Sequence, residues 1–155
     1  MQSQHEVFRN IFEDIKKRLV SSFAEAEVDM KVELRKNHKE LKNVPICYVE
    51  MTDLSPTANI GTGEIELVSR WEISVVASNQ NHFTIMDASA FIAAILHNEY
   101  IADLYPCRYV GSSDGQLSFN IPNYTCWHTE LEITVRAGVD DWKRFDFFPE
   151  NRLGD

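Results

Sequence analysis

The tripeptide Cys126-Trp127-His128 is where a thiol and an imidazole lie two residues apart in this sequence. Residues two apart in a strand project from the same face, so the pair could act as a nucleophile and its base. Such a pair usually needs an acidic residue that orients the imidazole, and the sequence does not indicate which residue would do so. A solvent-facing histidine beside an incidental cysteine explains the same tripeptide. A small cytosolic hydrolase that uses Cys126 and His128 stays open as an alternative.

The other reactive side chains lack the spacing of an active site. The sequence Gly61-Thr62-Gly63 is a GxG, but a dinucleotide site needs a further glycine and a helix start directly after it. His82 and His97 fall at opposite ends of one predicted helix, and no cluster of Cys, His and Asp has the spacing of metal ligands. We therefore expect no catalytic residue, no cofactor and no metal.

Composition narrows the class of protein. The chain has 155 residues, 44% of them hydrophobic and 25% charged, as in an ordinary soluble domain. Its formal net charge is −9, which argues against nucleic-acid binding by phosphate neutralisation. We expect no membrane span and no secretory signal, because the sequence has no apolar run of suitable length. The three cysteines are scattered, which is typical of reduced thiols in the cytosol.

Residues 64–78 predict the element that organises the fold. Apolar side chains occupy nearly every odd position, whereas the even positions are mostly polar: Ile65, Leu67, Trp71, Ile73, Val75 and Ala77 form the apolar set. A period of two over this length indicates a long strand with one buried face. Apolar residues at helical spacing in 88–96, among several alanines, predict a helix that packs closely on a sheet.

The rest of the chain supplies a second helix and further strands. An apolar stripe predicts a helix at residues 6–23: Phe8, Ile11, Phe12, Ile15, Leu19 and Phe23. Strands are expected at 28–34, 44–51, 107–110, 116–121 and 125–136, with a long loop at 53–63 and a mixed connection at 99–106. The fold class is therefore α+β, a mainly antiparallel sheet covered by two amphipathic helices. We expect a single domain over 1–155, with its core in 5–138 and an aromatic C-terminal extension at 139–155.

Four segments together resemble the tail terminator (tail-completion) proteins of long-tailed bacteriophages and prophages. These are the helix at 8–23, the strand ending RWEISVVASNQ, the helix ASAFIAAIL and the strand WHTELEITVRAG. The resemblance implies a phage tail protein-like fold that assembles as a ring, commonly a hexamer. Such a ring caps the tail tube and joins the tail to the head. The implied partners are the chain itself, the tail tube protein and the head–tail connector, first in the bacterial cytoplasm and then in the virion tail.

We expect self-association through the edges of the long strand and through the loop at 53–63. The expected interface residues are Asp53, Ser55, Asn59, Glu64, Glu66 and Glu72. Acidic side chains around a lumen would repel phosphate, so DNA would pass without specific binding. Besides the hydrolase, a second alternative is an adaptor domain that binds a peptide by adding it to a sheet edge.

Overall fold

The structure is a computed structural model that describes residues 6–34, 45–57, 63–78, 82–114 and 124–143. In chain order its elements are α1 (Val7–Glu25), β1 (Lys31–Glu33), β2 (Ile46–Pro56), β3 (Glu64–Ser78), α2 (His82–Leu96), β4 (Tyr100–Ile101), β5 (Tyr105–Asp114), β6 (Tyr124–Gly138) and α3 (Val139–Trp142).

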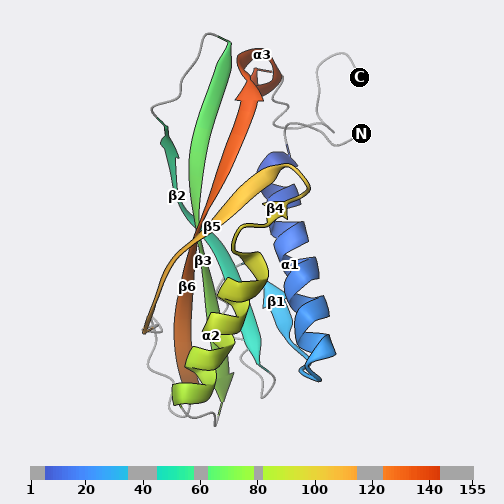
Figure 1. The fold of residues 1–155 in the computed structure, drawn as a ribbon, viewed down its shortest axis with the longest axis vertical. Helices are drawn as coiled ribbons and strands as arrows, with labels where there is room; N and C mark the ends of the chain where they lie inside the picture. Colours follow the sequence, from blue (N-terminus) through green and yellow to red (C-terminus); the bar gives the residue numbers. More distant parts are fainter. Residues whose placement is uncertain (1–5, 35–44, 58–62, 79–81, 115–123, 144–155) are drawn as a thin grey trace, which may run out of the picture.

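The strands form one twisted sheet in the order β1-β2-β3-β6-β5-β4. Only the β1–β2 pair is parallel among these neighbours, and every other pair is antiparallel. Figure 1 shows α1 and α2 against the same side of the sheet. We call this side the core face and the opposite side the outer face. The α+β class is therefore confirmed, with a mainly antiparallel sheet covered by two long helices.

β3 lies in the middle of the sheet, and its odd side chains face the helices as predicted. Trp71, Ile73, Val75 and Ala77 are buried in the main core, together with Leu131, Ile133 and Val135 of β6. The even face of β3 is not simply solvated. Val76 belongs to a second buried cluster, on the outer face, with Ile46, Tyr48 and Cys126. The sheet is thus apolar on both faces at this end.

α1 presents the predicted stripe to the core. Ile11, Ile15 and Leu19 are fully buried. The helix ends where Glu27 adopts a left-handed conformation, with φ 62°. The N–H of Val28 then donates to the carbonyl of Phe23 at 2.8 Å, and the N–H of Glu27 donates to the carbonyl of Ala24 at 2.9 Å. These two bonds form a Schellman motif built without glycine.

The C-terminal part of the described chain packs on the core. α3 follows β6 directly, and its Trp142 ring stacks on Phe8 of α1 with ring centroids 6.3 Å apart. Phe8 and Trp142 both pack against the main core cluster. The core therefore continues past residue 138 as far as this tryptophan. Residues 144–155 lie outside the described part.

The predicted loop at 53–63 is wrong in its first part. β2 continues to Pro56, with Asp53 opposite Arg70 and Ser55 opposite Val68. A β-bulge between Met51 and Asp53 resets the alternation, so the pattern of one residue in two fails there. Polar residues and proline are tolerated because this part of β2 is a sheet edge. Asn59 lies outside the described residues.

Two smaller predictions are also corrected. The connection expected at 99–106 is a β4–β5 hairpin, whose turn places Ala102 and Asp103 at φ 53° and 62°. Such turns usually carry glycine or asparagine, and neither residue is present here to indicate a turn. β5 extends to Asp114, beyond the predicted end at 110, and the strand expected at 116–121 lies outside the described residues. The strand expected at 28–34 is shortened to Lys31–Glu33.

Candidate functional site

Cys126 and His128 share the outer face of β6, as their spacing predicts. The thiol of Cys126 is buried, with 4% of the residue exposed, in the cluster that contains Ile46, Tyr48 and Val76. His128 lies opposite Ser74 of β3. A nucleophile must be reachable by its substrate, and this cysteine is surrounded by apolar side chains. The burial favours a packing role for the thiol.

The imidazole of His128 makes a contact that the sequence analysis missed. Its Nδ1 lies 2.7 Å from Oγ of Ser74 and 3.4 Å from Oε1 of Glu72. The register of β3 and β6 thus brings Ser74 and Glu72 beside His128, although 54 positions separate Ser74 from His128 in the sequence. Only the correct β3–β6 pairing could have revealed the contact.

A serine, a histidine and a carboxylate invite comparison with a hydrolase triad. In such a triad the serine and the acid bind opposite nitrogens of the imidazole, so that a proton can pass through the ring. Here the oxygens of Ser74 and Glu72 both approach Nδ1 of His128. This arrangement anchors the imidazole to β3.

The acidic even face of β3 is partly neutralised by β6. Arg136 contacts Glu66 at 2.7 Å, from Nη2 to Oε2, and Glu64 at 3.6 Å, from Nε to Oε2. Thr57 also donates its hydroxyl to Glu66 at 2.9 Å. Two of the predicted interface carboxylates therefore have a cationic partner within the chain. If Glu64 and Glu66 lined a lumen, the negative electrostatic potential there would be weaker than their formal charges suggest.

Glu132 lies between two arginines on the same outer face. Its carboxylate oxygens are 2.6 Å from Nη2 of Arg108 and 2.8 Å from Nη2 of Arg70. The hydrogen bond from Arg108, with that from Arg70, lowers the pKa of Glu132 below its usual value. The three side chains tie β3, β6 and β5 together across the sheet.

One row on the outer face carries only acidic side chains. Glu50 of β2 lies opposite Glu72 of β3, which in turn lies opposite Glu130 of β6. Like charges directly opposite one another on neighbouring strands destabilise a sheet. The row ends at Glu50, which is exposed on the last long strand on this side of the sheet.

No group of carboxylates, histidines and cysteines within the described ranges could hold a metal ion.

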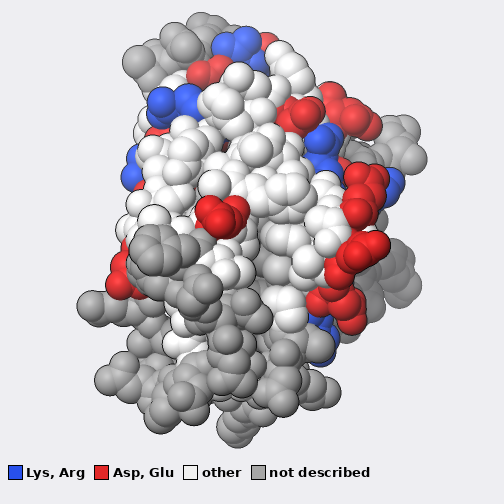
Figure 2. All heavy atoms as spheres, turned by 60° about the horizontal axis from the view of Figure 1, so that its bottom comes forward, with Lys and Arg blue, Asp and Glu red and all other residues white. Residues whose placement is uncertain are grey.

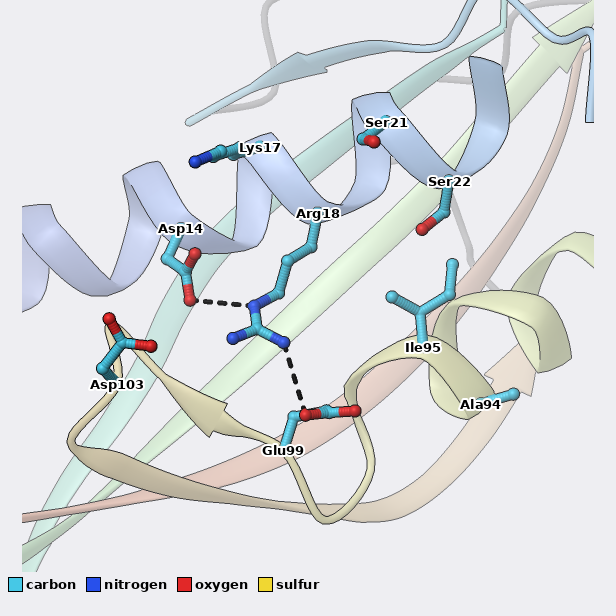
Figure 3. A pocket seen from close by; sticks show the side chains of 9 residues that line it. All are labelled: Asp14, Lys17, Arg18, Ser21, Ser22, Ala94, Ile95, Glu99 and Asp103. Carbon is cyan, nitrogen blue, oxygen red and sulfur yellow. Dashed lines mark hydrogen bonds and ion pairs between the residues drawn. The ribbon is translucent and has the colours of Figure 1, made fainter. Parts of the chain in front are cut away.

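A groove of about 600 Å³ lies between α1, α2 and the β4 hairpin (Figure 3). Arg18 spans it, with Nε 2.9 Å from Asp14 Oδ2 and Nη1 3.5 Å from Glu99 Oε2. The guanidinium also donates to the carbonyl of Tyr100 at 3.0 Å, and Asp14 accepts the N–H of Ala102 at 2.7 Å. These contacts pin the hairpin turn to α1. The groove therefore marks the contact between α1 and the β4–β5 hairpin, because Arg18, Asp14 and Glu99 at its centre already bind one another.

The exposed side of α2 is almost without charge. Its only charged residue is Asp87, although Ala90, Phe91 and Ala94 are all exposed. Figure 2 shows a largely uncharged middle on one face of the molecule, with acidic side chains gathered along one side. Exposed apolar surface of this kind often marks a contact with another protein.

Within the described ranges, part of the strand on each side of the sheet has no neighbouring strand beyond it. β1 pairs with β2 only at Ile46, Cys47 and Tyr48, so residues 50–56 have no strand beyond them among the described residues. β4 pairs with β5 only at Tyr105 and Pro106. We call 50–56 the β2 edge and 108–114 the β5 edge. β3, by contrast, is paired with β6 at residues 64–78 and with β2 at residues 67–76, so little of its own backbone is left for the self-association expected through its edges.

No known family model matches this chain, and a search of curated proteins finds no significant match. Within the described residues, no helix is long and apolar enough to cross a membrane.

Proposed function

We propose that this chain is a structural subunit of a bacteriophage or prophage tail, with a phage tail protein-like fold. In this proposal several copies form a ring, commonly a hexamer, that caps the tail tube and joins the tail to the head connector. The observation that carries the proposal is the pair of open sheet edges, the β2 edge and the β5 edge.

Two different edges suit a ring better than a single one would. A contact between two different patches on identical subunits repeats from copy to copy, and it closes into a ring when the rotation allows. Residues 50–54 on one edge and Arg108, Val110 and residues 112–114 on the other are exposed. Isolated proteins normally shield such edges, because they pair readily with other chains.

A capping subunit also needs a surface for the tube. The uncharged exposed side of α2 is our candidate, since Ala90 and Ala94 would let another chain approach closely. The burial of Cys126 and the approach of Ser74 and Glu72 to the same nitrogen of His128 support a protein that acts through its surfaces. DNA would pass through the ring without specific binding, in keeping with the net charge of −9.

The proposal is tested by deleting the gene from its prophage and imaging the particles. We expect full capsids beside unjoined tails of abnormal length, and wild-type protein should restore joined particles. Ala94→Arg should fail to restore them, because it places a charge on the proposed tube contact. Ala24→Arg is the matched control on the exposed side of α1 and should restore them. Normal infectious particles from the deletion would overturn the proposal.

The open edges also favour a second candidate, an adaptor that adds a peptide strand to its sheet. Analytical ultracentrifugation separates the two. A ring subunit should show species heavier than the 17.9 kDa monomer as its concentration rises. An adaptor should stay monomeric and bind extended peptides.

A further inference from the structure

We infer that His128, Ser74 and Glu72 form a proton-operated clamp between β3 and β6. Uptake of a proton by the imidazole of His128 strengthens the contact between the two strands, and loss of that proton weakens it. The clamp lies on the outer face, beside the row of Glu50, Glu72 and Glu130. It is independent of the ring proposed above, because all its atoms belong to one copy of the chain.

The contacts of Nδ1 indicate that this nitrogen of His128 carries a hydrogen. It lies 2.7 Å from Oγ of Ser74 and 3.4 Å from Oε1 of Glu72. A carboxylate oxygen only accepts hydrogen bonds, so a lone pair on Nδ1 would be repelled by Glu72. With a hydrogen on Nδ1, the imidazole donates to Ser74, and the Ser74 hydroxyl donates in turn to Glu72 at 3.5 Å. A second proton then binds Nε2, and the ring becomes a cation beside the carboxylate of Glu72.

Carboxylates dominate the charges next to the imidazole. Glu130 is the next residue after His128 on the outer face of β6. Glu72 lies diagonally across on β3, and Glu50 lies beyond Glu72 on β2. The register places Asp114 of β5 on the other face of the sheet. A positive charge on the imidazole therefore relieves the repulsion between the acidic side chains of the row.

The cations of the same face contact carboxylates outside this row. Arg70 and Arg108 lie 2.8 Å and 2.6 Å from Glu132. Lys31 lies 3.6 Å from Glu33, at the far end of the row that contains the imidazole. The rest of that row supplies hydroxyl groups: Tyr48 of β2, Ser74 of β3 and Ser113 of β5.

Partial burial strengthens the attraction between the imidazole and Glu72. The side chains of His128 and Glu72 are 12% and 21% exposed, so salt screens their charges less than it would at the surface. Burial alone disfavours a charged imidazole, whereas a carboxylate within about 4–6 Å favours it. Because Glu72 is in direct contact and Glu130 is the next side chain along the strand, the attraction prevails. The folded protein therefore holds the proton more tightly than the unfolded chain does.

The clamp makes stability depend on pH near neutrality. A group that binds its proton more tightly in the folded state stabilises the fold below its midpoint in the unfolded chain, which is about 6.5 for histidine. This contribution is lost as the pH rises through the midpoint of the folded protein. The imidazole of His128 should therefore stabilise the protein more at about pH 6 than at about pH 8.5.

Titration of the histidine rings by nuclear magnetic resonance tests the proton uptake. We expect the midpoint of His128 in the wild type to lie about one pH unit above that of an unperturbed histidine. Glu72→Gln keeps the shape of the side chain and removes its charge, so it should lower this midpoint by about one pH unit. His97, whose Nδ1 accepts the N–H of Tyr109 at 3.0 Å, is the control in the same spectra and should titrate identically in both proteins.

Thermal unfolding tests whether the proton holds the two strands together. The difference in melting temperature between the wild type and His128→Gln should be larger at about pH 6 than at about pH 8.5. A purely structural role for the ring would give the same difference at both pH values. Glu72→Gln offers the same comparison while the imidazole stays in place, and circular dichroism shows that each variant is folded.

The clamp would be overturned by a wild-type midpoint for His128 at or below about 6.5. A midpoint that Glu72→Gln leaves unchanged would also overturn it, as would melting-temperature differences for both variants that do not change with pH. A raised midpoint that falls in Glu72→Gln, together with a larger loss of stability at the lower pH, would establish it.

Discussion

The indole nitrogen of Trp71 donates a hydrogen bond to Oγ of Ser69, 2.9 Å away on the same face of β3. Ser69 in turn donates to the carbonyl of Ile133 at 2.7 Å, although both Ser69 and Ile133 are completely buried. Ser69 is the one exception to the apolar odd positions of this strand. It is polar because it satisfies a buried indole N–H in the core.

Ser69→Ala should therefore destabilise the fold by about 1–3 kcal/mol, since it leaves the Trp71 N–H unsatisfied in the core. Urea denaturation followed by tryptophan fluorescence measures the change. Ser113→Ala, at an exposed position on β5, is the control and should stay within about 0.5 kcal/mol of the wild type. Equal stabilities for the two variants would show that the buried hydrogen bonds contribute nothing net.

Glu27→Gly should stabilise the protein by about 0.5–1 kcal/mol, because a left-handed conformation is costly for a residue with a Cβ and free for glycine. The φ of 62° at Glu27 is the basis of this expectation. Thermal unfolding gives the measurement. The matched control Glu25→Gly lies within α1 and should lose a similar amount. A lower melting temperature for Glu27→Gly would contradict the end of α1 as described.

The faces of α1, β3 and β6 could be predicted from the sequence because each repeats its pattern over many residues. The odd side chains Trp71 and Ile73 are buried as predicted, and His128 shares a face with Cys126 as its spacing requires. In a long strand, one polar residue such as Ser69 does not obscure the alternation of apolar and polar positions.

The rest depends on contacts that no local pattern records. The end of β2 has no strand signal in the sequence, because the bulge at Thr52 breaks the alternation and Ser55-Pro56 is typical of a turn. The contact between Ser74 and His128 and the row that ends at Glu50 come from cross-strand register. The open edges follow from strand order, which places β3 in the middle of the sheet.

Glu132→Gln should make stability depend less on pH in the acidic range. The pKa of Glu132 is lower in the folded protein than its usual value, so its carboxylate stabilises the fold above that usual value, near pH 4–5. This stabilisation is lost as the pH falls through the lowered pKa.

Denaturation at pH 7 and pH 3 measures the effect, which should be about 0.2–1 kcal/mol because the side chains are partly exposed. Glu25→Gln is the control, since Glu25 is exposed at the end of α1 and no arginine contacts its carboxylate among the described residues. An identical pH dependence in the wild type and Glu132→Gln would show that the contacts to Arg70 and Arg108 are not formed in solution.

Alkylation of the folded protein distinguishes a structural role for Cys126 from a catalytic role in a hydrolase. Cys126 is 4% exposed, so iodoacetamide at neutral pH should modify it at least about tenfold more slowly than the exposed thiol of Ala24→Cys. Mass spectrometry of timed samples identifies the modified residue. Fast, selective modification of Cys126 would favour a reactive nucleophile paired with His128.

Negative-stain electron microscopy of the purified protein, alone and mixed with tail tubes, tests the central claim most directly. We predict rings seated on the ends of the tubes, and tubes that no longer elongate when more tube protein is added. Tubes with bare ends that keep growing in excess protein would contradict the proposed capping function.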